Sequence, residues 1–148
     1  MTDSAIQVLL VEDDANDVTL TLRALQQHRL ANRIEVVRDG QEAVDYLFGA
    51  EGADGRLPAN PMPRFILLDL KLPKLSGLEV LARIKADQRT RSIPVTILTS
   101  SREDIDVARA YELGVNSYIV KPVDFAQFSD AVRQVGFYWL LLNESPHS

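Results

Sequence analysis

Short apolar runs alternate along the chain with stretches in which apolar residues recur at helical spacing. The apolar runs predict five β-strands, at Ile6–Val11, Ile34–Val37, Phe65–Leu68, Val95–Leu98 and Ser117–Val120. The stretches between them predict helices at Asn16–His28, Gln41–Phe48, Gly77–Ala86 and Asp104–Leu113, with a fifth helix from Phe125 onward. The pattern is a strand followed by a helix, repeated five times.

Two of these strands, Val8–Val11 and Phe65–Leu68, are apolar at every position. Strands that are apolar on both faces are typical of a parallel sheet covered by helices on each side. We therefore expect an open α/β sandwich of three layers. Sequences typical of capping boxes mark helix starts at Ser76–Glu79, Ser101–Asp104 and Asp124–Gln127. Gly114 marks a helix end.

Length and composition restrict the function. The 148 residues fit a single domain with no separate output domain, and Gly49–Arg64 is expected to form a surface loop. The absence of cysteine excludes a disulfide scaffold and a thiol nucleophile. The net charge of -5 and the lack of a basic face argue against nucleic-acid binding, so we expect protein partners. Because no apolar run approaches the roughly 18 residues of a membrane span, we expect a cytoplasmic protein.

Polar residues follow each predicted strand, and the carboxyl ends of parallel strands meet at one edge of a sheet, where ligands bind. In chain order they are Glu12-Asp13-Asp14, Arg38-Asp39, Asp69, Thr99-Ser100-Ser101 and Lys121-Pro122. Three acids, a hydroxyl and an amine can therefore converge on one site. The bond before Pro122 is also a candidate for a cis peptide.

Asp69 ends a strand that should lie in the middle of the sheet, where an unpaired carboxylate is costly to bury. Glu12 and Asp13 on a neighbouring strand would repel it unless a cation joined them. Mg²⁺ suits such a set of oxygen ligands. With Thr99 and Lys121 compensating charge on transferring oxygens, Asp69 could act as a nucleophile toward phosphorus.

These residues resemble the receiver domains of two-component response regulators, over roughly Ile6 to Val135. The matching segments are Val8–Asp14, Leu67–Pro73 with Ser76-Gly77, Ile97–Ser100 and Tyr118–Pro122. The resemblance implies a flavodoxin-like fold with sheet order 2-1-3-4-5. It also implies metal ligation by Glu12, Asp13, Asp69 and the Lys71 carbonyl, and phosphorylation of Asp69 by a sensor histidine kinase. Thr99 and Lys121 would contact the phosphoryl group, and Tyr118 would swing inward behind Thr99.

More narrowly, four segments look like the small regulators that partner phytochrome-type histidine kinases. They are Arg38–Ala43, Gly49–Arg64, Tyr111–Tyr118 and Phe137–Trp139. The spacing of Phe125, Phe128, Val132, Val135, Trp139 and Leu142 also predicts one apolar helical stripe, in a helix over residues 125–142. Its end should overshoot the sheet and form a homodimer or partner surface at Phe137, Tyr138, Trp139 and Leu142. The alternative is that Gly136 breaks this helix and the tail folds back.

Other classes remain open to different degrees. A dinucleotide-binding domain and a Walker-type NTPase are disfavoured, because neither glycine-rich motif follows the first strand. A Mg²⁺-dependent phosphohydrolase with an aspartate nucleophile would use the same acids and lysine. A third possibility is an interaction module on this scaffold that is not phosphorylated.

Overall fold

The structure, a computed structural model, describes residues 8–26, 34–49, 62–100 and 105–134. Its strands are β1 (Val8–Val11), β2 (Ile34–Val37), β3 (Phe65–Asp69), β4 (Val95–Thr99) and β5 (Ser117–Val120). Its helices are α1 (Ala15–Gln26), α2 (Gly40–Phe48), α3 (Gly77–Ala86), α4 (Ile105–Leu113) and α5 (Phe125–Gln134). Strands and helices alternate as the apolar pattern predicts.

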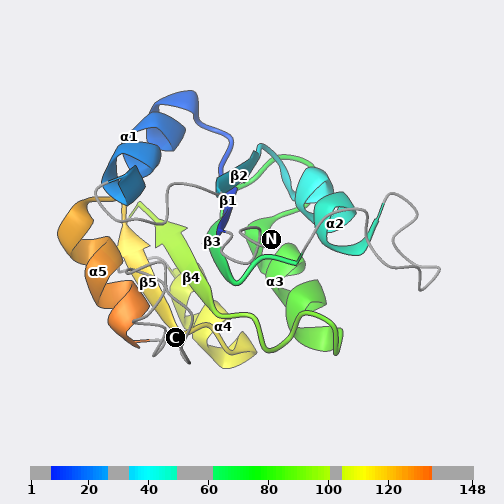
Figure 1. The fold of residues 1–148 in the computed structure, drawn as a ribbon. Coiled ribbons are helices and arrows are strands. Elements are labelled where there is room, and N and C mark those ends of the chain that lie inside the picture. The colour runs from blue at the N-terminus through cyan, green and yellow to red at the C-terminus, as the bar shows by residue number, and fades with distance from the viewer. Residues whose placement is uncertain (1–7, 27–33, 50–61, 101–104, 135–148) are drawn as a thin grey trace, which may run out of the picture.

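The five strands form one parallel sheet in the order β2-β1-β3-β4-β5 (Figure 1). This is the order that the resemblance to receiver domains implies, so the expected fold is confirmed. All carboxyl ends therefore lie at the same edge of the sheet. The central position of β3, between β1 and β4, puts the last residue of β3 in the middle of that edge.

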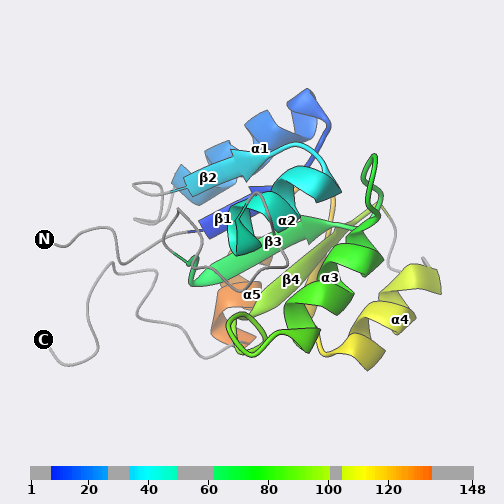
Figure 2. The ribbon, with the colours of Figure 1, turned by 90° about the vertical axis from the view of Figure 1, so that its right-hand side faces the viewer.

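The sheet has an apolar core on each face, because alternate side chains of a strand point to opposite sides. Leu9 and Val11 of β1 belong to the cluster under α2, α3 and α4, whereas Val8 and Leu10 belong to the cluster under α1 and α5. Figures 1 and 2 show one layer of helices on each side of the sheet. This explains why β1 and β3 are apolar at consecutive positions.

Two strand ends differ from the expected bounds. β3 and β4 each extend by one residue, to Asp69 and Thr99, because Asp69 pairs with Leu98 and Thr99 with Val120 in the sheet. Asp69 and Thr99, two polar residues of the candidate site, therefore belong to strands and not to loops. The helix bounds agree to within two residues where the structure describes them.

The cap signals have three different outcomes. Ser76 and Glu79 form the expected reciprocal capping box at the start of α3. Gly114 ends α4 with a φ of 108°, in the region that favours glycine. At α5 only half of the expected box forms: the Gln127 backbone N–H donates to Asp124 Oδ1, but the Gln127 side chain bonds to other groups. Ser101–Asp104 lies outside the described residues.

Helix α5 contradicts the predicted apolar stripe at its first position. Phe128 is fully buried, and its ring packs on that of Phe65 with centroids 5.9 Å apart, whereas Phe125 is 43% exposed. The helix faces the sheet with Phe128 and Ala131, which are three residues apart. The four predicted interface residues lie outside the described residues, as does most of the Gly49–Arg64 loop. No helix in the described parts is long and apolar enough to cross a membrane.

Candidate functional site

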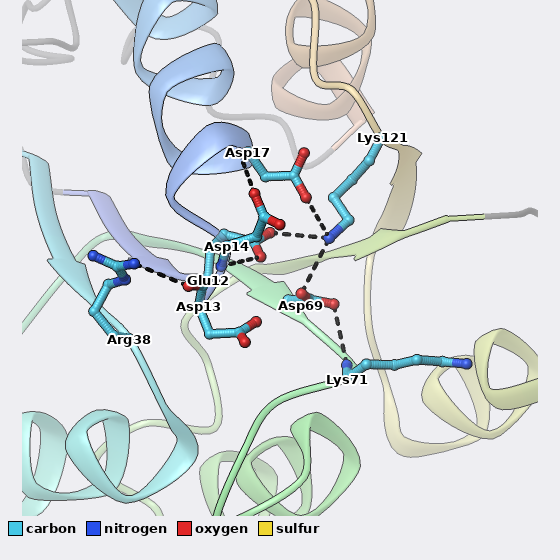
Figure 3. Close-up of polar contacts among 8 residues, drawn as sticks. All are labelled: Glu12, Asp13, Asp14, Asp17, Arg38, Asp69, Lys71 and Lys121. Carbon is cyan, nitrogen blue, oxygen red and sulfur yellow. Dashed lines mark hydrogen bonds and ion pairs between the residues drawn. The ribbon is translucent and has the colours of Figure 1, made fainter.

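Three acids meet at the carboxyl edge of the sheet. Glu12 directly follows β1, and its backbone N–H donates to the Val37 carbonyl at 3.0 Å, which fixes it beside β2. The Glu12 residue is 0% exposed and Asp69 is 4% exposed, while Asp13 is an exposed residue whose carboxylate is directed toward Asp69 (Figure 3). Each of the three offers a carboxylate oxygen, and these oxygens lie within 4.8 Å of one another. The expected convergence of these acids is confirmed.

Lys121 follows β5 and reaches across the edge into this cluster (Figure 3). Its Nζ lies 3.2 Å from Glu12 Oε1, 3.1 Å from Asp69 Oδ2 and 3.0 Å from Asp17 Oδ2. These distances place the lysine where it can compensate negative charge at Asp69. The Lys121–Pro122 peptide bond is cis.

The site is a pocket of about 270 Å³ at the strand ends. Its lining includes five acids, Glu12, Asp13, Asp14, Asp17 and Asp69, together with Lys71, Thr99 and Lys121. Thr99 is only 3% exposed and sits at the end of β4, the strand next to Asp69. The backbone N–H of Lys71 donates to Asp69 Oδ1 at 3.1 Å, while the Lys71 side chain points away from the acids (Figure 3).

Burial and like charge act together on Glu12. Loss of solvent, followed by repulsion from the Asp69 carboxylate, raises the pKa of Glu12 to about 7. At Lys121 burial disfavours the charged form, but the hydrogen bond to Asp17 and the charges of Asp69 and Glu12 outweigh it. The pKa of Lys121 is therefore raised well above its usual value. One ammonium group does not neutralise all the carboxylates around it, so these carboxylates still repel one another.

The donor set fits a hard divalent cation. It offers three carboxylates with oxygens close enough to share one ion, and the repulsion that raises the pKa of Glu12 is what a cation would relieve. The set contains oxygen donors alone, which favours Mg²⁺ over metals that prefer nitrogen or sulfur. Glu12, Asp13 and Asp69 are thus suited to hold Mg²⁺.

The raised pKa of Glu12 has a consequence for stability. Between pH 4.5, the ordinary value, and about 7, the folded metal-free protein keeps a proton that the unfolded chain has lost. The contribution of Glu12 to folding stability then falls as pH rises through this window. Thermal unfolding in the presence of a chelator measures the slope, and Glu12→Gln, which cannot titrate, should give a flatter one. Equal slopes in the two proteins would show that Glu12 does not carry this proton.

Three side chains take part in the site in ways that the sequence pattern did not reveal. Asp17 pairs with Lys121, and an Arg38 nitrogen donates to the Asp13 carbonyl at 2.9 Å. The carboxamide of Gln127 bonds to the backbone N–H and carbonyl of Val120 and to the Pro122 carbonyl. It thereby fastens the chain on both sides of Lys121. The one available signal was the position of Asp17, three residues after Asp14, in the first helical turn.

The expected switch residue Tyr118 pairs with Ile97 of β4, two residues before Thr99. Alternate residues of a strand point to the same side, so Tyr118 and Thr99 lie on the same face of the sheet. The Tyr118 ring meets that of Tyr111 edge-on, with centroids 6.4 Å apart and an interplanar angle of 88°. The ring also packs against the core cluster under α4. Inward movement of Tyr118 behind Thr99 stays a prediction.

The chain is similar in sequence to known proteins over most of their length. The chain is 46% identical to a probable methanogenesis regulatory protein, FilR2, of Methanothrix harundinacea, over 94% of this chain and 86% of the relative. It is 37% identical to the response regulator Rcp1 of Synechocystis, over 90% of this chain and 88% of the relative.

Solved structures are similar in fold and sequence. The bacteriophytochrome response regulator RtBRR has a TM-score of 0.79 at 52% identity, over 95% of this chain and 84% of its own. For the bacteriophytochrome response regulator AtBRR the TM-score is 0.79 at 50% identity, over 94% and 98%. The Mn²⁺-bound form of Rcp1 has a TM-score of 0.69 at 35% identity, over 95% and 96%.

The family profile described as the response regulator receiver domain matches residues 8–133, from the start of β1 to the last turn of α5. That span contains the sheet and every residue of the acidic pocket. The chain therefore belongs to the response regulator receiver domain family and is related to the phytochrome response regulators.

Proposed function

We propose that the protein accepts a phosphoryl group on Asp69 with bound Mg²⁺ and signals by a change of shape. The observation that carries this proposal is the position of Asp69 at the end of the central strand, with Lys121 Nζ 3.1 Å from its Oδ2. Glu12 and Asp13 lie close enough to share a cation with it. A buried carboxylate between a cation site and a lysine is suited to attack phosphorus.

Phosphoryl transfer to Asp69 exchanges a phosphorus–nitrogen bond for a phosphorus–oxygen bond. One oxygen of the Asp69 carboxylate forms a bond to the phosphorus of a phosphohistidine, and the phosphorus–nitrogen bond breaks. The imidazole nitrogen keeps the electron pair and takes up one proton from solvent. Lys121 and the Thr99 hydroxyl are positioned to stabilise charge on the transferred oxygens. Mg²⁺, held by Glu12, Asp13, Asp69 and the Lys71 carbonyl, would neutralise part of the same charge.

The relatives support a partner for this reaction. Two of the most similar structures are named bacteriophytochrome response regulators, which favours a phytochrome-type sensor histidine kinase as the donor. We propose that the change of shape involves Thr99 and Tyr118, which lie on one face of neighbouring strands beside α4. A phosphoryl group at Asp69 would recruit the Thr99 hydroxyl and make room for the tyrosine ring.

We further infer that the receiver domain acts in the cytoplasm and that its partners are proteins. A homodimer through Phe137, Tyr138, Trp139 and Leu142 rests on sequence spacing alone, because these residues lie outside the described part of the chain. Light scattering with and without a phosphoryl donor would reveal such a dimer.

The experiment that separates a receiver from a phosphohydrolase compares label with released phosphate. The protein is incubated with acetyl phosphate and Mg²⁺, and intact mass and inorganic phosphate are followed together. A receiver should reach up to one phosphoryl group per chain, with slow phosphate release. Sustained release at many equivalents per chain would instead support the hydrolase, and no label in any condition would support the unphosphorylated interaction module.

A further inference from the structure

Every N–H donor of the Lys121 ammonium has a carboxylate partner in the unphosphorylated protein. The ammonium carries three N–H donors, and it has three carboxylate partners, Glu12, Asp17 and Asp69, at 3.0 to 3.2 Å. Figure 3 shows these partners around the same nitrogen. A phosphoryl oxygen can therefore gain a bond from Lys121 only if one of the three partners gives one up.

Asp17 differs from the other two partners in its position. Glu12 and Asp69 stand at the ends of β1 and β3, whereas Asp17 lies in the first turn of α1. Its backbone N–H donates to Asp14 Oδ1 at 2.9 Å, which holds this turn at the rim of the pocket. The three acids that converge as a possible cation site are Glu12, Asp13 and Asp69, so Asp17 is outside that set.

Exposure decides which partner is released at least cost. The side chains of Glu12 and Asp69 are 0% and 5% exposed, while that of Asp17 is 24% exposed. A carboxylate at the rim can replace its lost ion pair with water, whereas a buried one needs a second cation, here the proposed Mg²⁺, to replace it. Asp17 is therefore the partner that Lys121 can lose without help from another cation.

We propose that Asp17 is a competing counterion, which holds Lys121 in the resting protein and yields it to the phosphoryl group. This inference rests on the proposed phosphorylation of Asp69. Two effects of Asp17 then act in the same direction: it occupies one donor of Lys121, and its charge repels the anionic phosphoryl group. Release of Asp17 would also carry the state of the pocket to α1.

Asp17→Asn tests the proposal, because the amide keeps the shape of the side chain and removes its charge. With acetyl phosphate as donor and saturating Mg²⁺, the rate of labelling should rise about two- to five-fold, the range for a partly exposed ion pair. Asp17→Glu restores the carboxylate and should return the rate toward that of the wild type. Glu35→Gln removes an exposed charge on β2, outside the pocket lining, and should leave the rate unchanged.

A second readout separates competition for Lys121 from a structural effect on α1. In the presence of Mg²⁺, Asp17→Asn should bind beryllofluoride, an analogue of the phosphoryl group, more tightly by a similar factor in calorimetry. Thermal unfolding identifies a loss of helix stability, which would not tighten this binding.

Labelling of Asp17→Asn at or below the wild-type rate, or an equal increase in Glu35→Gln, would overturn the proposal. A wild type that takes no label fails differently: it refutes phosphorylation itself, and the role of Asp17 with it.

Discussion

Gly77→Ala is expected to destabilise the protein by about 3 kcal/mol or more, near the upper end for overpacking a core. A Cβ at this position would lie far inside van der Waals contact with the Asp69 carbonyl and the Leu70 backbone. Both obstacles are main-chain atoms, so no side chain can rotate away to make room. The Gly77 backbone N–H also donates to the Leu70 carbonyl at 2.9 Å, which holds α3 against the end of β3.

A matched control comes from a second glycine. At Gly114 the φ of 108° strains any other residue, but a Cβ would meet only the flexible Lys85 side chain, at 3.7 Å and beyond. Gly114→Ala should cost about 1 to 2 kcal/mol. Urea unfolding of both variants measures the difference. A smaller loss in Gly77→Ala than in Gly114→Ala would contradict the close approach of α3 to the strand that carries Asp69.

Lys121→Met should change two properties in opposite directions. The rate of phosphoryl transfer should fall about 10²- to 10³-fold, the usual effect of losing one donor to the transferred group. Mg²⁺ should bind more tightly, because the variant removes the cation that competes for Glu12 and Asp69. Labelling by acetyl phosphate measures the rate at saturating Mg²⁺, and calorimetry measures the affinity.

Lys71→Met is the matched control for this variant. Lys71 also lines the pocket, but its contact with Asp69 is through the backbone N–H, and its side chain points away (Figure 3). Both the rate and the Mg²⁺ affinity should change much less than in Lys121→Met. A Lys121→Met protein that is labelled as fast as wild type would show that the ammonium does not assist the transfer.

The site could be located from the sequence because the carboxyl ends of all strands in a parallel sheet lie at one edge. Asp69 and Lys121 are 52 residues apart, yet each follows a strand, and the strands end at one edge. No side-chain geometry is needed for that prediction. Apolar alternation and resemblance likewise placed the five strands in their correct order.

The contribution of Asp17 could not be read in the same way. An acid in the first turn of a helix is common, because it interacts favourably with the helix dipole. Whether its side chain turns toward solvent or toward Lys121 depends on how α1 sits over the sheet. Only half of the Asp124–Gln127 box forms, for a similar reason: the Gln127 side chain has partners in the backbone around Lys121.

The predicted stripe on α5 was wrong at Phe125 because regular spacing does not fix how a helix is rotated on its sheet. Phe128 and Ala131 face β3 and β5, and this rotation turns Phe125 outward. Which residues of a helix are buried therefore depends on how the helix is rotated on the sheet, and not only on which residues are apolar.

The most direct test of the central claim is the intact mass of wild type and Asp69→Asn after incubation with acetyl phosphate and Mg²⁺. Asp14→Asn serves as the control, because Asp14 lines the same pocket but lies outside the three-acid cluster. We predict a gain of one phosphoryl group in the wild type and in Asp14→Asn, and none in Asp69→Asn. An equal gain in Asp69→Asn would contradict the assignment of Asp69 as the phosphoacceptor.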